Sequence, residues 1–344
     1  MATDMSVEIE ALANQDPNAP LLQVRDLQVE FRTRNGLAKA VQGVNFEVHE
    51  GETLAILGES GCGKSVTAQA IMGIIDTPPG YVTGGQVRYK GVDLLAMPED
   101  QRRLVRANRI AMIFQDALSA LNPVFTVGFQ LGELFRKHRG MSRADSKVKA
   151  VELLDLVRIP AAHQRVNDYP HQFSGGMRQR VMIAMALALD PELVIADEPT
   201  TALDVTVQAQ IMKLLADLQA ERNMGLILIT HDMGVVADVA DRISVMYAGR
   251  IVEEAPVNDI YARPSHPYTK ALLESIPRVD MKGQELNAIR GLPPSLTNIP
   301  PGCSFNPRCR YVRDECRTGA PPPLYQVEPG IASACHFWKE VRGE

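Results

Sequence analysis

Apolar and polar residues alternate along two neighbouring stretches near the start of the chain. The first stretch is Leu22–Phe31 and the second is Ala40–Val48, and the dipeptide Asn35-Gly36 between them has the composition of a turn. Alternation with a period of two is typical of a strand that buries one face. The pattern therefore predicts an antiparallel β patch in this part of the chain.

Short apolar runs and helical patterns then follow one another. The runs with the composition of buried strands are Thr53–Leu57, Ile110–Phe114, Leu193–Ala196 and Leu226–Ile229, with one more short strand expected within 83–93. Helical spacing is found over 66–72, 128–165, 176–189 and 208–222. Strands that alternate with helices predict an α/β fold with a mainly parallel sheet covered on both faces.

The composition changes after about residue 260. The last 84 residues hold 12 of the 23 prolines and four of the five cysteines, and no long periodic helix or strand is evident past Ser275. A loop-rich segment of this size needs a staple to hold it together. We therefore expect a tail at 1–20, a main domain at 21–260 and a separate C-terminal extension, rich in Cys and Pro, at 261–344.

Charge and hydropathy restrict where the chain works. Its net charge is −5, so no global basic field points to nucleic acid or to an anionic membrane. The longest apolar run, Val181–Leu189, is far shorter than the ~18–20 residues that span a bilayer. The first twenty residues hold acidic but no basic side chains, the opposite of a secretory signal. We expect a disordered acidic tail on a chain that stays in the cytoplasm, where disulfides are disfavoured.

The clearest chemical motif is the G-x-x-x-x-G-K-S pattern of a phosphate-binding loop. Its residues, between a predicted strand and a predicted helix, are Gly58, Glu59, Ser60, Gly61, Cys62, Gly63, Lys64 and Ser65, followed by Val66. Glycines let backbone N–H groups approach phosphate oxygens, and a helix N-terminus favours an anion. Lys64 is expected to reach the β- and γ-phosphates, and Ser65 to ligate Mg²⁺. The loop, with Val66, predicts binding of a nucleoside triphosphate.

Two acidic residues, Asp197 and Glu198, directly follow the predicted strand Leu193–Ala196. An aspartate at the end of a strand, in a chain with a phosphate loop, suits contact with Mg²⁺. The glutamate after it can polarise the water that attacks the γ-phosphate. Without the phosphate loop this pair could equally be an ordinary loop start; with the loop upstream, the pattern favours a catalytic role.

The stretch Phe173–Arg180 reads Phe-Ser-Gly-Gly-Met-Arg-Gln-Arg and precedes Asp197 by about twenty residues. With it, the chain resembles the nucleotide-binding subunit of an ATP-binding-cassette (ABC) transporter over 22 to about 260. The resemblance implies a P-loop ATPase of ABC type with a RecA-like core, an antiparallel β subdomain and a helical subdomain at about 116–172. It also implies that the chain hydrolyses ATP with Mg²⁺.

In that family, a Ser-Gly-Gly signature at a helix N-terminus caps the γ-phosphate held by the partner subunit. The matching residues here are Ser174, Gly175, Gly176 and Met177. Small residues let backbone amides approach an anion, and the Ser174 hydroxyl can donate one more hydrogen bond. Because the signature of one subunit completes the phosphate loop of another, the resemblance implies a dimer of cassettes. Asp204 matches the D-loop, which crosses the dimer interface.

Three further residues match family elements in the expected order. Gln115 matches the glutamine that contacts Mg²⁺ and the attacking water, and His231 matches the switch histidine that contacts the γ-phosphate. Phe31 is placed like the aromatic residue that stacks on the adenine ring, although taken by itself its pattern favours a place in the core.

Details of the motifs point to one branch of the family. The fifth signature residue is usually Gln, and Met177 in its place is similar to the D-type ATPase of oligopeptide and dipeptide importers. Ser265–Thr269 resembles the His-Pro-Tyr motif that follows the cassette there, and the Cys-rich C-terminus also belongs to that branch. The resemblance implies a heterodimer with an F-type ATPase at the cytoplasmic face of the membrane.

The implied partners are that second ATPase subunit, two membrane permease subunits and an extracytoplasmic substrate-binding protein, with no nucleic acid. Peptides are the implied substrate, and nickel chelates or glutathione remain alternatives because similar cassettes serve them. A soluble ABC ATPase that acts on DNA or ribosomes is the alternative from another class. Such proteins typically carry two cassettes or large insertions, which this sequence lacks.

Four cysteines, Cys303, Cys309, Cys316 and Cys335, are separated by five, six and eighteen residues. Four cysteines in a cytosolic, proline-rich segment indicate thiolate ligation of a metal. Zinc favours closer paired spacings, whereas a cuboidal 4Fe-4S cluster accommodates wider gaps, and the branch resemblance also implies such a cluster. Zn²⁺ and four free or structurally buried thiols remain alternatives to the cluster, and a redox or iron sensor remains an alternative to a structural staple. Cys62 lies in the phosphate loop and is not a ligand candidate.

Overall fold

The computed structural model describes residues 19–116, 120–201, 203–276 and 289–344. The predicted acidic tail therefore lies almost entirely outside the described residues. The chain forms two compact units. Unit 1 takes in Met1–Val48, Thr53–Ala96 and Ile229–Glu344, and unit 2 takes in His49–Glu52 and Met97–Leu228. Among the described residues, no helix is both long enough and apolar enough to cross a bilayer.

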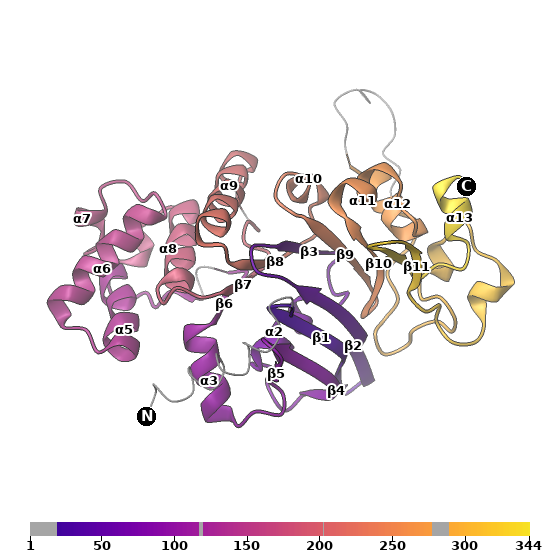
Figure 1. Ribbon diagram of the computed structural model, residues 1–344, viewed down its shortest axis with the longest axis horizontal. Helices are drawn as coiled ribbons and strands as arrows, with labels where there is room; N and C mark the ends of the chain where they lie inside the picture. Colours follow the sequence, from indigo (N-terminus) through magenta and orange to yellow (C-terminus); the bar gives the residue numbers. More distant parts are fainter. Residues whose placement is uncertain (1–18, 117–119, 202, 277–288) are drawn as a thin grey trace. The chain divides into compact units, whose positions relative to one another are not determined.

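Unit 1 begins with an antiparallel sheet in the order β2-β1-β4-β5 (Figure 1). Its strands are β1 (Leu22–Thr33), β2 (Gly36–Val48), β4 (Gly80–Tyr89) and β5 (Val92–Asp93). The predicted antiparallel patch is confirmed, because β1 pairs with β2 from Leu22↔Val48 to Thr33↔Gly36. A bulge between Val24 and Leu27, with Asp26 at φ 46, shifts the buried face by one residue.

The second sheet region of unit 1 carries the phosphate loop. Its strands, in the order β11-β12-β10-β9-β3, are β11 (Tyr325–Glu328), β12 (Ile331–Ser333), β10 (Arg250–Pro256), β9 (Arg242–Tyr247) and β3 (Thr53–Leu57). β3 pairs parallel with β9, whereas β9, β10, β12 and β11 pair antiparallel. The β9–β10 hairpin, which the sequence pattern did not predict, closes through Ala248 and Gly249, both with positive φ.

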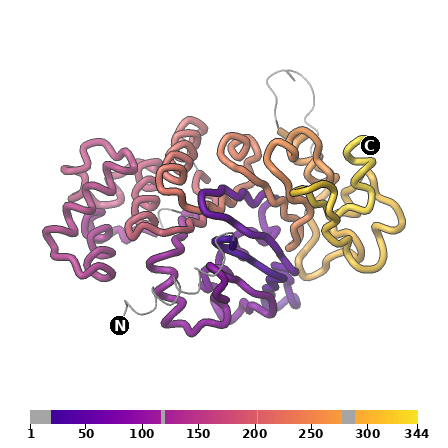
Figure 2. Tube along the Cα trace, viewed as in Figure 1, coloured from indigo at the N-terminus to yellow at the C-terminus, as the bar shows by residue number. Residues whose placement is uncertain are grey.

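The remaining elements of unit 1 after β8 are short. The helical elements are α10 (Met233–Val236), α11 (Val257–Ala262), α12 (Pro267–Glu274), η2 (Asn306–Arg308), η3 (Asp314–Arg317) and α13 (Trp338–Arg342). β12 pairs with β10 through Glu253↔Ser333, and Figure 2 shows the yellow end of the chain beside the orange β10 segment. Beyond Ser275 every described element is short, as the sequence pattern predicted.

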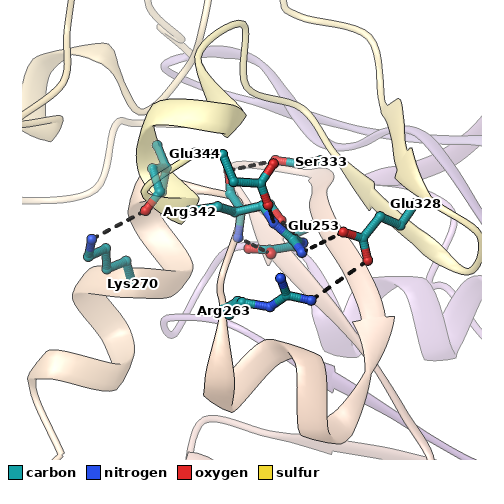
Figure 3. Close-up of polar contacts among 9 residues, drawn as sticks. Glu253, Arg263, Lys270, Glu328, Ser333, Arg342 and Glu344 are labelled. Atoms are coloured by element: carbon teal, nitrogen blue, oxygen red, sulfur yellow. Dashed lines mark hydrogen bonds and ion pairs between the residues drawn. The ribbon is translucent and has the colours of Figure 1, made fainter.

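A cluster of charged side chains fastens the C-terminal residues to β10 and α12 (Figure 3). The Arg342 side chain, 0% exposed, donates to Glu328 at 2.9 Å and to the Ser265 hydroxyl at 3.2 Å. Glu253, on β10, accepts from the backbone N–H of Ser265, and burial raises the pKa of this carboxyl to about 7. Lys270, on α12, donates to the Val341 carbonyl at 3.3 Å.

Unit 2 is mainly helical, with parallel strands. β6 (Ile110–Ile113) pairs parallel with β7 (Leu193–Asp197), and β7 lies between β6 and β8 (Gly225–Thr230) in the strand order. The helices are α3 (Glu99–Asn108), α5 (Val127–Arg139), α6 (Arg143–Leu156), α7 (Ala162–Arg165), α8 (Gly175–Leu187) and α9 (Val205–Arg222). The helical pattern at 128–165 corresponds to three of them. The sequence did not predict α3, because only Leu104, Val105 and Ala107 are apolar there.

Candidate functional site

The phosphate loop joins β3 to α2 (Lys64–Met72) in unit 1, as predicted. Gly61 and Gly63 have φ of 77 and 111, a backbone conformation that side chains disfavour. A Cβ atom on Gly63 would stand 2.3 Å from the Ala40 carbonyl oxygen. The loop therefore needs glycine for its turn and for its close contact with β2, and α2 begins at Lys64, directly after Gly63.

Lys64 is buried, and its ammonium group bends back over the loop. Nζ donates to the carbonyl of Gly58 at 2.8 Å and to that of Glu59 at 3.1 Å. Ser65 is half-buried on the first turn of α2. A buried cation at the N-terminus of a helix is an arrangement that favours a bound anion. Burial raises the pKa of the Cys62 thiol, so this cysteine stays protonated near pH 7.

Phe31 and His231 also belong to unit 1. Phe31 is half-buried near the end of β1, and a Cβ atom on Gly80 would come within 2.8 Å of its ring. The missing side chain of Gly80 therefore leaves room for the aromatic ring. His231 is exposed just after β8, and Asp232 beside it caps α10 by accepting from the Gly234 N–H at 2.9 Å.

In unit 2, the structure brings Gln115 and Glu198 together. Glu198 follows β7 with a left-handed φ of 46, and the preceding Asp197 is 4% exposed. Gln115 Nε2 donates to Glu198 Oε2 at 2.9 Å, and the Thr201 hydroxyl donates to the same oxygen at 2.9 Å. A carboxylate held by two donors has a defined orientation, which a general base requires. Thr201 belongs to none of the sequence motifs, although it lies only three residues after Glu198.

The signature residues begin α8, also in unit 2. Ser174 is its N-cap, and Oγ accepts from the Met177 N–H at 3.4 Å. A Cβ atom on Gly176 would stand 2.6 Å from Val207 Cγ1 in α9, so only glycine fits there. Asp204 is the N-cap of α9 and accepts from the Val207 N–H at 3.0 Å. The structure therefore places the signature beside the segment of Asp204 within one unit.

The four C-terminal cysteines line one small cavity of unit 1. The cavity has a volume of about 10 Å³, and Cys303, Cys309, Cys316 and Cys335 all contribute to its wall. Burial raises the pKa of Cys309 to about 11 and that of Cys335 to about 12. Among the described residues, no group of three or more His, Cys, Asp or Glu side chains is arranged to hold a single metal ion. The thiols thus converge without the spacing of a mononuclear site.

The structure also adds a contact that the sequence pattern did not predict. The Arg308 guanidinium donates to the Glu59 carboxylate of the phosphate loop at 2.6 and 2.9 Å. The two residues are 249 positions apart, and no local pattern relates them. Only the folded chain shows that the cysteine-rich region contacts the phosphate loop.

Comparison with known families finds two matches along the chain. Residues 41–201 match the family described as "ABC transporter". Residues 252–316 match the family described as "Oligopeptide/dipeptide transporter, C-terminal region". The first range contains the phosphate loop, Gln115, the signature and Glu198, and the second contains three of the four C-terminal cysteines.

Several characterised proteins are similar over most of the chain. An "Oligopeptide transport ATP-binding protein OppD" of Bacillus subtilis is 53% identical over 89% of this chain and 86% of that protein. The OppD of Salmonella typhimurium is 49% identical over 96% of this chain and 98% of that protein. Among solved structures, the dimeric ATP-binding cassette MJ0796 bound to ADP and Pi has a TM-score of 0.62 and 29% identity, covering 69% of this chain and 98% of that one.

Proposed function

This chain belongs to the family of ABC transporter ATP-binding proteins, and from that premise we propose that it hydrolyses ATP to drive the import of peptides through a membrane permease. It is an ABC-type ATPase of the oligopeptide and dipeptide branch. The assignment of peptides as the substrate rests on the match of residues 252–316 to the C-terminal region of that branch. This region follows a complete set of cassette motifs along the chain.

The family motifs give each matching residue a task in the proposed reaction. In unit 1, the phosphate loop binds the triphosphate, Lys64 stabilises its β- and γ-phosphates, and Ser65 ligates Mg²⁺. In unit 2, Glu198 accepts a proton from the attacking water, oriented by the Gln115 amide. Asp197 supports the Mg²⁺ site. We also assign His231 to a contact with the γ-phosphate and Phe31 to stacking on the adenine ring.

The dimer is the second part of the proposal. Ser174–Met177 caps the triphosphate bound by a partner cassette, and the exposed N-cap Ser174 and the N-terminus of α8 suit an anion. Met177 has no side-chain donor at the position where Gln is usual, which supports an F-type partner and two unequal ATP sites. Two permease subunits and an extracytoplasmic binding protein complete the importer, with this chain at the cytoplasmic face of the membrane.

Reconstitution tests the function directly. The chain, its partner ATPase and the two permeases are placed in proteoliposomes, and uptake of labelled di- and oligopeptides is measured with the binding protein present. We expect uptake that requires ATP and stops when ATP is replaced by a non-hydrolysable analogue. Uptake only of glutathione or a nickel chelate would contradict the peptide assignment. ATP hydrolysis stimulated by DNA, with no stable complex with permeases, would contradict the transport role.

For the cysteine centre we propose a 4Fe-4S cluster held by the four cysteines lining the cavity. Four thiolates at about 2.3 Å from one zinc ion would lie within about 4 Å of one another, and the described residues contain no such group. A cluster with an iron at each of four corners instead lets the thiols stand further apart. Protonated, neutral thiols can lie close together without charge repulsion, and each would lose its proton on ligation. The cavity holds about one water, so its walls must separate to accommodate a cluster.

Iron analysis of anaerobically purified protein tests this proposal. We expect about four iron and four sulfide per chain with a visible absorption band, and loss of both when Cys309 and Cys335 are replaced by Ser. Replacing Cys62 by Ser serves as the control and should leave the iron content unchanged. One zinc per chain without iron would support the alternative ligand. Unchanged folding and uptake after replacement of all four cysteines would contradict a structural staple.

A further inference from the structure

Glu59, the second residue of the phosphate loop, is held through all three of its polar groups. Its N–H donates to the Tyr268 hydroxyl at 2.9 Å, and its carbonyl accepts from Lys64 Nζ at 3.1 Å. Its carboxylate accepts two hydrogen bonds from Arg308, at 2.6 and 2.9 Å. Two of the three partners thus lie more than 200 residues further along the chain.

Arg308 has a fixed position relative to Glu59. Its side chain is 4% exposed, and a paired guanidinium and carboxylate in such surroundings form strong, directional hydrogen bonds. Nε donates to the Arg290 carbonyl at 3.1 Å, and one terminal nitrogen also donates to the Tyr247 hydroxyl at 3.4 Å. The guanidinium is therefore held on several sides by groups of unit 1.

Arg308 is also adjacent to the cysteine cavity in the chain, because it directly precedes Cys309, which lines that cavity. Cys303, Phe305 and Cys309 line that cavity. The Arg308 N–H donates to the Phe305 carbonyl at 3.0 Å, and the Cys303 N–H donates to the Cys316 carbonyl at 2.9 Å. The short segment that carries Arg308 is therefore joined, through its backbone, to residues that line the cavity.

The His-Pro-Tyr motif forms a second connection between the same two places. His266 lines the cysteine cavity, and Tyr268, two residues later, reaches the phosphate loop. The Tyr268 N–H donates to His266 Nδ1 at 3.1 Å. The Tyr268 ring also packs against Tyr247 and Phe305, with ring centroids 4.6 and 5.4 Å apart. The motif therefore contacts the cysteine cavity through His266 and the phosphate loop through Tyr268.

The charge of Glu59 makes this arrangement relevant to ATP. A carboxylate within a loop that binds a triphosphate repels the ligand unless its charge is compensated. Arg308 supplies that compensation and at the same time keeps the loop backbone in place. Without Arg308, the negative charge of the Glu59 carboxylate would be left uncompensated. Solvent would screen this charge little, because the Glu59 side chain is only 26% exposed.

We propose that Arg308 is a positioning residue that couples the four-cysteine centre to ATP binding: it neutralises and holds Glu59, and the state of the centre sets the position of Arg308. The proposal deepens the function proposed above and rests on it. The C-terminal region would thereby control the affinity of the phosphate loop for ATP, in addition to any structural role.

The first test measures the Kd for ATP by titration of the purified full chain. Arg308→Met should raise the Kd about tenfold, because the Glu59 charge is no longer compensated. The double variant Arg308→Met with Glu59→Gln should return the Kd to within about threefold of the original, since the repelling charge is gone. A purely structural role of Arg308 predicts no such recovery, and its absence overturns the electrostatic part of the proposal.

The matched control is Arg310→Met. Arg310 lies two residues away and pairs with Glu274 at the surface, with a side chain that is 55% exposed. We expect the Kd for ATP to stay unchanged in this variant. Equal weakening by Arg310→Met and Arg308→Met would overturn the proposal. Tyr268→Phe, which removes one hydroxyl and keeps the packed ring, gives a second variant for the case that Arg308→Met fails to fold, and it should also weaken ATP binding.

The second test addresses the cysteine centre itself. Cys309→Ser should raise the Kd for ATP in the original chain and have no further effect in the Arg308→Met, Glu59→Gln double variant. The same increase in both backgrounds, or no increase in the original chain, overturns the coupling. An original chain that binds no ATP would contradict the proposed function instead, so the two failures can be told apart.

Discussion

Replacing Glu198 by Gln is expected to lower the rate of ATP hydrolysis by about 10²-fold or more, while ATP binding persists. The amide keeps the size of the side chain and can still accept from Gln115 and Thr201, the two donors that orient Glu198 Oε2. It cannot take a proton from water, so the chemical step loses its base. Phosphate release under saturating ATP measures the loss, and titration with a fluorescent ATP analogue measures the binding that remains.

The control for this substitution is Glu221→Gln, the same change at an exposed position of α9 in the same unit. Hydrolysis should be unchanged there. Because the ATP-bound state of the Glu198 variant turns over slowly, we also expect it to accumulate as a closed dimer with the partner cassette, detectable by size-exclusion chromatography. Hydrolysis by Glu198→Gln at the original rate would remove Glu198 from the role of base.

Replacing Lys64 by Met is expected to weaken ATP binding by about 10²-fold or more and to abolish uptake. Lys64 is 4% exposed, and its ammonium donates to two carbonyls of the loop. We expect it to donate to the phosphate oxygens when ATP binds. Each hydrogen bond between charged groups is worth about 1.5–3 kcal/mol, and two of them correspond to about 10²-fold or more in Kd. Methionine preserves most of the buried volume, which limits the effect on folding.

Lys213→Met provides the comparison, because the Lys213 side chain is 73% exposed on α9 and pairs only with Asp217 among the ion pairs of the described residues. Its Kd for ATP should match that of the original chain. The two main variants must also differ from each other: Lys64→Met loses binding, whereas Glu198→Gln binds and does not turn over. Normal ATP affinity in Lys64→Met would contradict the placement of the phosphate site at this loop.

Local sequence patterns predicted the elements whose residues are close in the chain. The strand β3, the glycine turn and α2 follow from a stretch of about twenty residues, because each depends on backbone geometry and on neighbouring side chains. The caps Ser174 and Asp204 are local for the same reason. The β9–β10 hairpin and α3 were missed, since their stability comes from packing partners elsewhere rather than from a strong periodic pattern.

The sequence by itself determined the phosphate loop, the Asp197-Glu198 pair, the signature and the cysteine spacing, and with them the family and its ATPase chemistry. Only the tertiary structure decided that Gln115 and Thr201 hold the Glu198 carboxylate, that four cysteines surround one cavity, and that Arg308 neutralises Glu59. The reason is physical. A motif consists of residues that are adjacent in the sequence and can therefore be recognised there. A contact between residues 249 positions apart forms only in the folded chain, where burial of the core compensates the entropy lost when the two residues are brought together.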